Sequence, residues 1–370
     1  MNTSELLHVL ALLRIDGVGD IVAKKLINHC GSAENVFKAK LKTLKAIDGI
    51  GQVLIKNLNN KTVFEKAESE VQYIQSENIK VLYFLEDDYP DRLKHCIDGP
   101  VLLFASGNFD FKNRRMISIV GTRQITSYGA EFCKKLIEDL AIFNPIIVSG
   151  FAYGVDIVAH QAAMEHDLQT IGVLAHGLNQ IYPKTHKKYV AKMERNGGFL
   201  TEFWSNSSPE KENFVKRNRI VAGMSEATIV IESAEKGGSL ITANIANDYN
   251  RDVFAVPGRT TDKYSQGCND LIKTQRANLI TSAADLVYCL NWEIASAAQN
   301  DHKAIQKQLF VSLDFDEQKI YDYLQQNGKQ SLDIVALDCD FPIFKLSSVL
   351  LTMELKGIIR PLPGKLFEAI

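Results

Sequence analysis

Several motifs are missing from this sequence of 370 residues, and each absence argues against a class of protein. There is no G-x-x-x-x-G-K-S/T loop, which argues against a P-loop NTPase, and no G-x-G-x-x-G, which argues against dinucleotide binding. Neither H-E-x-x-H nor G-x-S-x-G occurs, so two common hydrolase motifs are absent as well. The six cysteines are scattered without a C-x-x-C pair, which suits a reducing compartment better than a disulfide framework or a zinc site.

The sequence also has few prolines, no low-complexity tract and little net charge. Its longest N-terminal apolar run, residues 6–13, is too short to span a bilayer and lacks the basic flank of a signal peptide. The formal net charge is −2, so bulk charge does not attract nucleic acid, and any anion site must be a local cluster. We therefore expect a cytoplasmic protein that binds no membrane and needs no cofactor or metal.

The N-terminal region contains a repeat. Residues 12–26 read LLRIDGVGDIVAKKL and residues 44–58 read LKAIDGIGQVLIKNL. Apolar periodicity on both sides of each I-D-G-x-G predicts two helices joined by a glycine hairpin, and two copies are expected to pack into one small domain. The repeat resembles a tandem helix-hairpin-helix (or SAM-like) domain, whose hairpin N–H groups can meet nucleic-acid phosphates. Alternatively, the glycines only close tight turns, since Asp16 and Asp48 in the hairpins would repel phosphate.

From residue 116 the pattern changes to short apolar runs that alternate with helical stretches. The runs are MISIV, PIIVS, TIGVLA, GFLTEF, ATIVIES, DVFAVPG and ANLIT, and the helices are expected near 128–141, 156–166, 215–224 and 240–249. Strands that are apolar on both faces, with helices between them, predict an α/β fold with a mainly parallel, doubly wound sheet. Such sheets bind ligands in the loops that follow the carboxyl ends of the strands.

The C-terminal part has a different pattern. Residues 293–308 have the composition of a linker. After them, expected helices near 315–327, 331–337 and 345–356 precede an apolar strand, a Pro-Gly turn and a second strand, which predicts a winged helix. The predicted organisation is therefore a helical domain over 1–65, a connecting segment over 66–105, the α/β core over 106–292, the linker, and the winged helix over 309–370.

Glycine turns that lead into helices gather at the expected carboxyl ends of the core strands. The stretches VGTRQITSYG, SGFAYGVD and EKGGSLITA each place backbone N–H groups at a helix N-terminus, where the helix dipole favours an anion. Ser127 is the candidate N-cap of the first helix. The residues that we expect at this anion site are Gly121, Thr122, Arg123, Ser127, Ser149, Gly150, Gly154, Lys184, Gly237, Gly238 and Ser239.

The stretch FVKRNRIVAG adds three cations, Lys216, Arg217 and Arg219, within four positions. In a helix over 215–224, Arg217 is in line with the buried face, whereas Lys216 and Arg219 share another face. Cations at a helix start oppose the dipole, so an anion is needed, either from Glu210 and Glu212 or from a ligand phosphate, which we favour. The site prediction therefore also includes Phe214, Lys216, Arg217, Asn218 and Arg219.

No catalytic constellation is evident. Asp156 and His160 fall at i, i+4 on one helix face and could form a base with its orienting partner or bind a metal. The interpretation that we favour is that Asp156 caps its helix and His160 is a core residue. Glu202 is a further lone carboxylate near a strand end.

Taken together, seven motifs identify the chain as a member of the DNA-processing protein A (DprA/Smf) family. They are VGTRQITSYG, SGFAYGVDIVAH, GLNQIYP, RNRIVAGMS, EKGGSLITANIA, VFAVPG and GCNDLI, in this order. The resemblance implies a Rossmann-like core between the helical domain and the winged helix. It also implies single-stranded DNA binding without hydrolysis, a homodimer formed through the core, and delivery of DNA to the recombinase RecA in natural transformation.

The resemblance implies that DNA phosphates are neutralised by Arg123, Lys216 and Arg219. It also implies that bases stack on Phe151, Tyr153, Tyr182 or Phe214. The C-terminal region from residue 301 has a net charge of −2, so we expect it to contact a partner rather than DNA.

Two other functions stay open. The stretch EKGGSLIT is also similar to the phosphate loop of nucleotide phosphoribohydrolases, in which Glu232 or Glu202 would have to face the ribose. In the second alternative the chain is a scaffold whose terminal domains hold partners.

Overall fold

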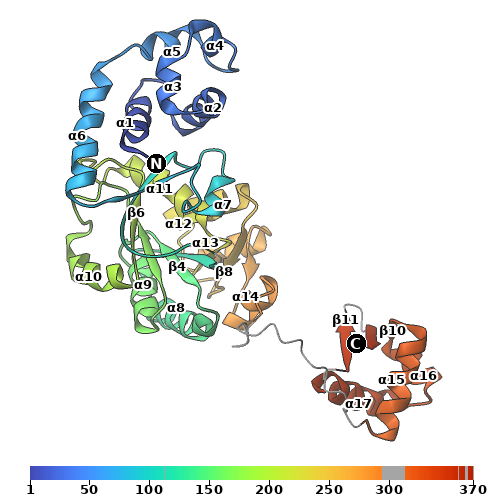
Figure 1. The fold of residues 1–370 in the computed structure, drawn as a ribbon. Helices are drawn as coiled ribbons and strands as arrows, with labels where there is room; N and C mark the ends of the chain where they lie inside the picture. Colours follow the sequence, from blue (N-terminus) through green and yellow to red (C-terminus); the bar gives the residue numbers. More distant parts are fainter. Residues whose placement is uncertain (113, 294–312, 357, 363–365, 370) are drawn as a thin grey trace. The chain divides into compact units, whose positions relative to one another are not determined.

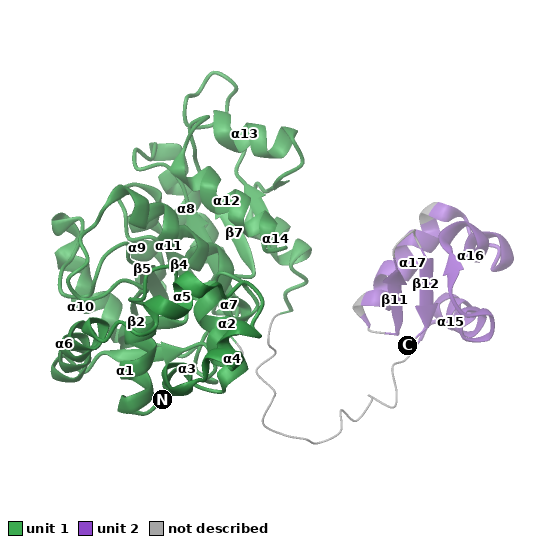
Figure 2. Ribbon diagram, turned by 90° about the horizontal axis from the view of Figure 1, so that it is seen from above, with its two compact units in different colours: residues 1–295 green, residues 296–370 purple. Residues whose placement is uncertain are grey.

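The computed structural model describes residues 1–112, 114–293, 313–356, 358–362 and 366–369. The chain forms two compact units, residues 1–295 and 296–370, which are coloured separately in Figure 2. Most of the predicted linker, residues 293–308, lies outside the described residues.

A nine-stranded sheet forms the centre of the first unit, in the order β1-β2-β6-β5-β4-β3-β7-β8-β9. The seven strands from β6 to β9 in this order are parallel, and β1 and β2 extend the β6 edge as antiparallel strands. All predicted core strands are present: β3 (Met116–Val120), β4 (Ile146–Ser149), β5 (Thr170–Val173), β6 (Gly197–Thr201), β7 (Ala227–Val230), β8 (Asp252–Ala255) and β9 (Asn278–Leu279). The α/β fold class is confirmed.

Residues 66–105 are more than the connecting segment that we expected. They contain most of helix α6 (Thr62–Ser76), helix α7 (Asp91–Lys94), the strand β1 (Lys80–Tyr83) and the first part of the strand β2 (Leu102–Asn108). The sequence pattern did not predict these two strands, because they are antiparallel and precede the series of apolar runs that begins at residue 116.

Helices cover both faces of the sheet (Figure 1). On one face, α8 (Ser127–Leu140), α9 (Val155–Glu165) and α14 (Ala283–Cys289) bury their apolar sides against β3, β4 and β7. On the other face, α11 (Lys211–Met224), α12 (Gly238–Asp248) and α13 (Gln266–Lys273) enclose a second apolar cluster with the same strands. α10 (Lys187–Arg195) packs beside α9 over β5 and β6. The central strands are therefore buried on both sides, as their continuous apolar sequence requires.

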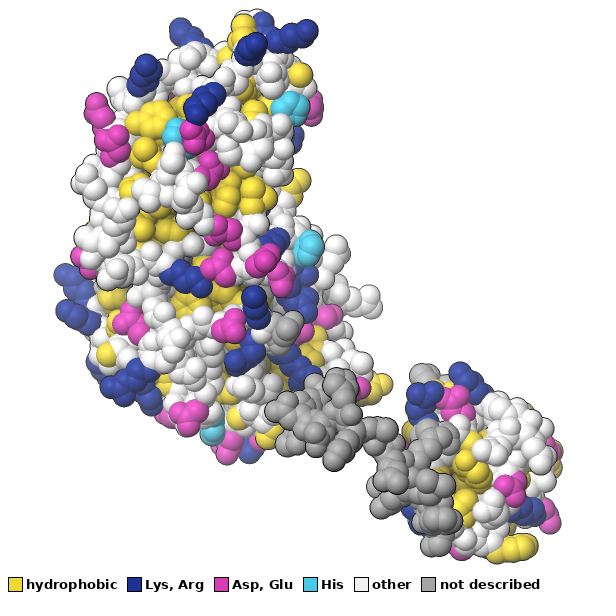
Figure 3. Space-filling view, viewed as in Figure 1, with side chains coloured by type: hydrophobic (Ala, Val, Ile, Leu, Met, Phe, Trp, Pro, Cys, Tyr) yellow, Lys and Arg dark blue, Asp and Glu magenta, His cyan; other side chains and the backbone are white. Residues whose placement is uncertain are grey.

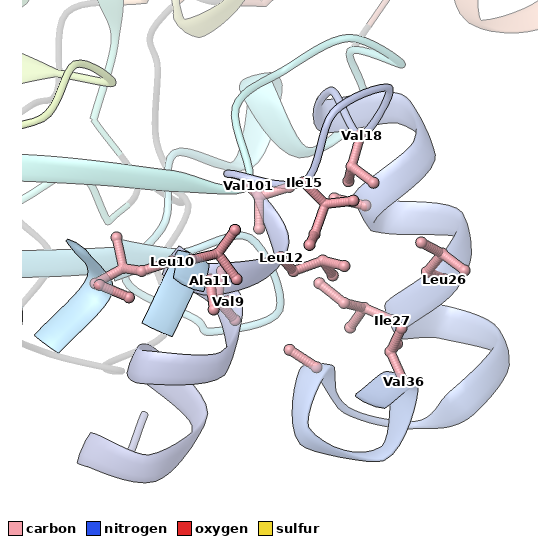
Figure 4. Packing of buried hydrophobic residues seen from close by; sticks show 14 of the residues in the cluster. Val9, Leu10, Ala11, Leu12, Ile15, Val18, Leu26, Ile27, Val36 and Val101 are labelled. Carbon is pink, nitrogen blue, oxygen red and sulfur yellow. The ribbon is translucent and has the colours of Figure 1, made fainter. Parts of the chain in front are cut away.

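The helical domain consists of α1 (Thr3–Leu12), α2 (Asp20–Cys30), α3 (Ala33–Lys38), α4 (Leu41–Lys45), α5 (Gln52–Asn57) and α6. Its two hairpins join α1 to α2 and α4 to α5, as predicted from the repeat. Gly17 and Gly49 have φ values of +90° and +81°, which favour glycine at these turns. Figure 4 shows Leu12, Leu26 and Val36 from three helices pointing toward one another, with Val101 from the core beside Ile15. The apolar core of the helical domain therefore continues into the sheet domain.

The second unit has the predicted three helices and a terminal hairpin. They are α15 (Phe315–Asn327), α16 (Leu332–Asp338) and α17 (Ile343–Leu355), with β11 (Ile359–Leu362) pairing to β12 (Leu366–Ala369) and the short β10 (Gln330–Ser331) completing the sheet. α15 begins with a capping box, in which the carboxylates of Asp314 and Glu317 each accept a hydrogen bond from the backbone N–H of the other residue.

Candidate nucleic-acid interface

The sheet changes direction beside β3. The chain runs from β3 through β4 and β5 to β6 on one side and then returns to β7 on the other side of β3. At this switch point the loops after adjacent strands diverge and leave a crevice, which is where doubly wound sheets bind ligands. A pocket of about 760 Å³ opens here. We call it the strand-end pocket; its lining residues come from 120–124, 150–156, 209–221 and 233–242.

Two glycines allow the backbone to approach closely behind the pocket. A Cβ atom on Gly150 would lie 1.7 Å from Nη1 of Arg217, so the guanidinium group packs directly on the glycine. At Gly154, φ is +76°, and a Cβ atom there would lie 2.2 Å from the carbonyl oxygen of Thr122. The loops after β3 and β4 are thus held together without side chains between them.

Arg217 is the central cation of the strand-end pocket. Its side chain lines the pocket although the residue is only 5% exposed. One Nη1–H donates to the carbonyl oxygen of Val173 at 3.1 Å, and Nε has no partner among the described residues. Burial lowers the pKa of Arg217, Asp156 acts in the opposite direction, and no carboxylate in the described part of the chain forms an ion pair with it. The guanidinium nevertheless stays charged at neutral pH.

Asp156 faces the same pocket from the first turn of α9 and is also buried. Its carboxylate accepts the N–H of Ala152 at 3.2 Å, so it binds the loop after β4 rather than capping α9, whose N-cap is Gly154. Burial raises the pKa of Asp156, and Arg217 opposes this shift. The predicted cap is therefore wrong in detail, although the carboxylate still satisfies backbone N–H groups.

His160 is the buried residue that we expected. Its Nδ1 pairs with the hydroxyl of Thr170 at 2.7 Å, and its Nε2 has no partner among the described residues. Burial, assisted by the nearby His186 and Arg217, lowers the pKa of His160 to about 3, so the ring is neutral at physiological pH.

Aromatic side chains lie at the mouth of the strand-end pocket. The guanidinium of Arg123 lies 5.3 Å from the ring centre of Phe214, and Phe214 meets Tyr182 edge to face at 5.9 Å. Tyr182 is 42% exposed, and Tyr153 is 44% exposed. Phe151, which we had also considered for base stacking, is fully buried among Phe199, His160 and His186, so that prediction is wrong. Its place at the strand end indicated exposure, but its side chain turns into the core.

Most of the predicted site residues do converge on this pocket. They are Gly121, Thr122, Arg123, Gly150, Phe214, Arg217, Asn218, Gly237, Gly238 and Ser239.

Six predicted residues lie outside the lining, and four of them are Ser127, Ser149, Gly154 and Lys184. Ser127 lines a neighbouring cavity, and Thr126 rather than Ser127 is the N-cap of α8, accepting the N–H of Gly129 at 3.2 Å. Ser149 is buried and donates to the carbonyl oxygen of Ile119, while Gly154 packs behind the pocket. Lys184 is exposed on a short 3₁₀ turn and is not part of the lining.

The predicted placement of Lys216 and Arg219 in the pocket is wrong. Nη2 of Arg219 lies 2.5 Å from Glu202 and 3.1 Å from Asp20, and Nζ of Lys216 lies 3.0 Å from Glu202. α11 begins at Lys211, four residues before the predicted start, so these cations are not at its first turn and do not need an anion there. Among the described residues, their carboxylate partners are Glu202 and Asp20 rather than Glu210 or Glu212.

Some lining residues escaped the prediction. Lys211 contributes a further exposed cation at the start of α11, and Gln124 and Thr242 add polar groups. Lys211 was not predicted because it lies in the charged stretch PEKENF, where two nearby glutamates make it resemble an ordinary surface charge.

Both carboxylates that the enzymatic alternative requires lie outside the lining of the strand-end pocket. Glu232 accepts the N–H of Thr126 at 2.9 Å and its hydroxyl at 2.5 Å, at the start of α8. Glu202 is held by Arg219 and Lys216. Both carboxylates are therefore engaged in contacts within the folded chain.

The fold and the site define a Rossmann-like protein with a pocket at the switch point of its sheet, lined in part by arginine and lysine side chains. The sequence model of DNA recombination-mediator protein A matches residues 80–291, and that of the DprA winged helix domain matches residues 308–365. The chain therefore belongs to the DprA/Smf family.

Known relatives cover most of the chain. Protein Smf of Synechocystis sp. is 34% identical over 304 residues, which span 80% of this chain and 73% of that protein. The X-ray structure of DNA processing protein A from Streptococcus pneumoniae matches with a TM-score of 0.64 and 31% identity, over 78% of this chain and 98% of that one. DNA processing protein A from Helicobacter pylori, whose structure concerns single-stranded DNA binding, matches with a TM-score of 0.51 and 28% identity over 58% of this chain and 95% of that chain.

Within the described residues, no helix has both the length and the apolar character needed to cross a membrane.

Proposed function

We propose that this chain binds single-stranded DNA in the strand-end pocket as part of DNA processing in recombination. The observation that carries the proposal is Arg217, a buried cation with one hydrogen bond and no ion pair among the described residues. Burying a charge without a partner costs folding free energy, so an arginine in this position is explained by an anionic ligand. A DNA phosphate is such an anion, and the guanidinium can bind it through two N–H groups.

The surroundings of Arg217 fit a single strand better than a free nucleotide. Arg123 and Lys211 place two more cations along the same opening, as neutralising successive phosphates requires. Phe214 and Tyr182 offer ring faces and edges at the mouth, on which unpaired bases can stack. In a duplex the bases are already stacked on one another, so these aromatic contacts favour single-stranded DNA.

The family relationship supports the finer parts of the proposal. We infer that the chain protects incoming single-stranded DNA in natural transformation and loads RecA onto it, acting as a homodimer through its Rossmann-like core. We also propose that it does so without catalysis, because Glu232 and Glu202 are engaged in structural contacts away from the pocket.

A binding experiment tests the central claim. Fluorescence anisotropy with a labelled oligothymidylate should show tight binding in the absence of ATP, and competition by blunt duplex should be weaker. Incubation with nucleoside monophosphates should release no free base. Equal affinity for the duplex, a requirement for ATP, or base release would each contradict the proposal. Pull-down of RecA and light scattering test the two partners.

A further inference from the structure

The far end of the helical domain carries a concentration of positive charge that the strand-end pocket does not use. Residues 38–61 contain six lysines and a single acidic residue, Asp48, which gives this segment a net charge of +5 although the whole chain is at −2. The segment includes α4, the second glycine hairpin and α5. Together with Lys25 of α2, we call it the basic tip. Figure 3 shows dark blue side chains gathered at this end of the molecule, where Figure 1 places α4 and α5.

These lysines are available to a partner. All six, and Lys25, are exposed. Lys38 pairs with Glu34 at 2.5 Å, but none of the others forms an ion pair with any residue that the structure describes. Like charges without interspersed carboxylates repel one another, so a surface of this kind is unusual unless it meets an anion.

The two copies of the repeat have different surroundings. The first hairpin contacts the sheet domain, whereas the second does not make the equivalent contacts among the described residues. In the first copy, Asp20 pairs with Arg219 and accepts the N–H of Val101 at 3.0 Å, so the first hairpin is held against the core. The position 32 residues later is Gln52, which is exposed and has no such contact among the described residues. The second hairpin therefore remains open, and Nζ of Lys25 lies 3.9 Å from the position of a Cβ atom on Gly49.

The chemistry of the basic tip selects among anionic partners. Residues 38–61 contain no Phe, Tyr or Trp, so the tip offers no ring on which an unpaired base could stack. The ammonium group of lysine is a point charge on a flexible side chain. It can contact phosphates, but such contacts do not distinguish one base from another. Duplex DNA carries its phosphates at a higher density than a single strand and releases more counterions for each phosphate contact, so a cluster of lysines gains more from binding a duplex. We propose that the basic tip is a second DNA site, which binds the phosphate backbone of duplex DNA.

This inference goes beyond the proposed function, because the duplex site does not depend on the strand-end pocket. The protein would then hold a single strand in the pocket and neighbouring duplex at the tip, two substrates on two surfaces of one compact unit. Duplex binding at the tip is expected to be weaker than single-strand binding and strongly salt-dependent, since it rests on counterion release alone.

The test replaces Lys25, Lys42 and Lys45 of the full-length chain together with glutamine, which removes charge and keeps the side-chain length similar. The matched control replaces Lys134, Lys192 and Lys273, which are exposed on α8, α10 and α13 and form no ion pair with described residues. Both triple variants change the net charge equally and should melt at the wild-type temperature. Binding is measured across a salt series with a labelled blunt duplex and with a labelled oligothymidylate.

For the duplex, the tip variant should flatten the slope of log K against log salt by up to about 2.7, at about 0.9 for each lost phosphate contact. The control should keep the wild-type slope, and Arg217→Gln should weaken oligothymidylate binding while leaving the duplex slope unchanged. If the tip variant and the control weaken duplex binding equally, or the tip variant leaves it unaltered, the duplex site is refuted. Loss of oligothymidylate binding in Arg217→Gln alone would still support the pocket, so the two proposals fail separately.

Discussion

Arg217 and Arg219 stand two residues apart in α11, are almost equally buried, and have opposite surroundings. Arg219 meets Glu202 and Asp20 and donates to the carbonyl oxygen of Asp98. Burial lowers its pKa, but these acidic groups outweigh burial and the net pKa is raised. Arg217 has no ion pair among the described residues, and burial leaves its pKa lowered. Among the described residues, one arginine is therefore compensated by two carboxylates, whereas the other is buried with one hydrogen bond and no ion pair.

The difference arises from helix geometry. Successive residues of an α-helix point about 100° apart, so two positions along the chain separate the two side chains by more than half a turn. Arg217 consequently faces the strand-end pocket, while Arg219 faces the helical domain, where Asp20 begins α2. The helix thus carries, on one face, a cation that forms no ion pair with the described residues and, on the other, a cation held by two carboxylates.

The largest effect is expected from Arg219→Ala. Removing one member of a buried ion network leaves Glu202 with only the exposed Lys216, and such losses cost about 3 kcal/mol or more of folding stability. Urea denaturation should show this loss, and limited proteolysis should cut first between the helical domain and the core. Affinity for oligothymidylate, measured where the variant is folded, should be unchanged. A stable variant with weakened binding would reverse the assignment of the two arginines.

Arg217→Gln should have the reverse profile. Losing a charged hydrogen bond to phosphate is expected to cost about 2 kcal/mol of binding, roughly a thirtyfold loss of affinity. Stability should change little, because the variant no longer buries a cation but also removes the charge that attracts the buried carboxylate of Asp156. Arg217→Lys is the charge-matched control and should recover only part of the affinity, since its ammonium cannot bind phosphate as a planar fork. Wild-type affinity in Arg217→Gln would disprove the role of the pocket.

The sequence predicted the scaffold of this site better than its charged side chains. Apolar runs and glycine turns located β3, β4, β7 and their loops, because both patterns are imposed locally by burial and backbone geometry. Arg219 was misplaced because its partners, Asp20 and Glu202, are distant in sequence and no periodicity links them. The early start of α11 at Lys211 added to the error, since a polar first turn carries no apolar signal. The antiparallel strands β1 and β2 were missed because their pairing with β6 is likewise non-local.

Gly150→Ala should perturb the same arginine without changing any charge. The added Cβ atom would overlap the guanidinium of Arg217, which must move away from Val173. We expect about a tenfold loss of affinity for oligothymidylate, equivalent to about 1.4 kcal/mol. In the double variant with Arg217→Gln, the two losses should not add, because both act through one side chain. Additive losses would indicate that the glycine contacts DNA independently. Gly19→Ala is the control, since a Cβ atom there meets nothing within 4 Å and Gly19 lies outside the lining of the strand-end pocket.

The smallest expected effect is the contribution of His160, which lies behind the strand-end pocket, to the pH dependence of folding stability. Burial, with His186 and Arg217, lowers the pKa of His160 to about 3 in the folded protein, from an ordinary value of 6.5 in the unfolded chain. Between these values the unfolded chain binds more protons, so the stability is complete above pH 6.5 and is lost as pH falls. At pH 5.5 the loss from this group should be about 1.4 kcal/mol.

His160→Asn isolates that contribution. Its stability at neutral pH will fall through lost packing, so the informative quantity is the change in unfolding free energy between pH 7.5 and 5.5, measured by urea denaturation at about those values. This change should be smaller in His160→Asn than in the wild type by about 1.4 kcal/mol. Arg217→Gln should leave the change as in the wild type, because burial is the main cause of the shift and the folded ring stays neutral at pH 5.5 after a modest rise of its pKa from about 3. Arg219→Gln should leave it as in the wild type, since Arg219 is not among the groups that shift His160. The same pH dependence in His160→Asn as in the wild type would show that another group causes the loss of stability between pH 7.5 and 5.5.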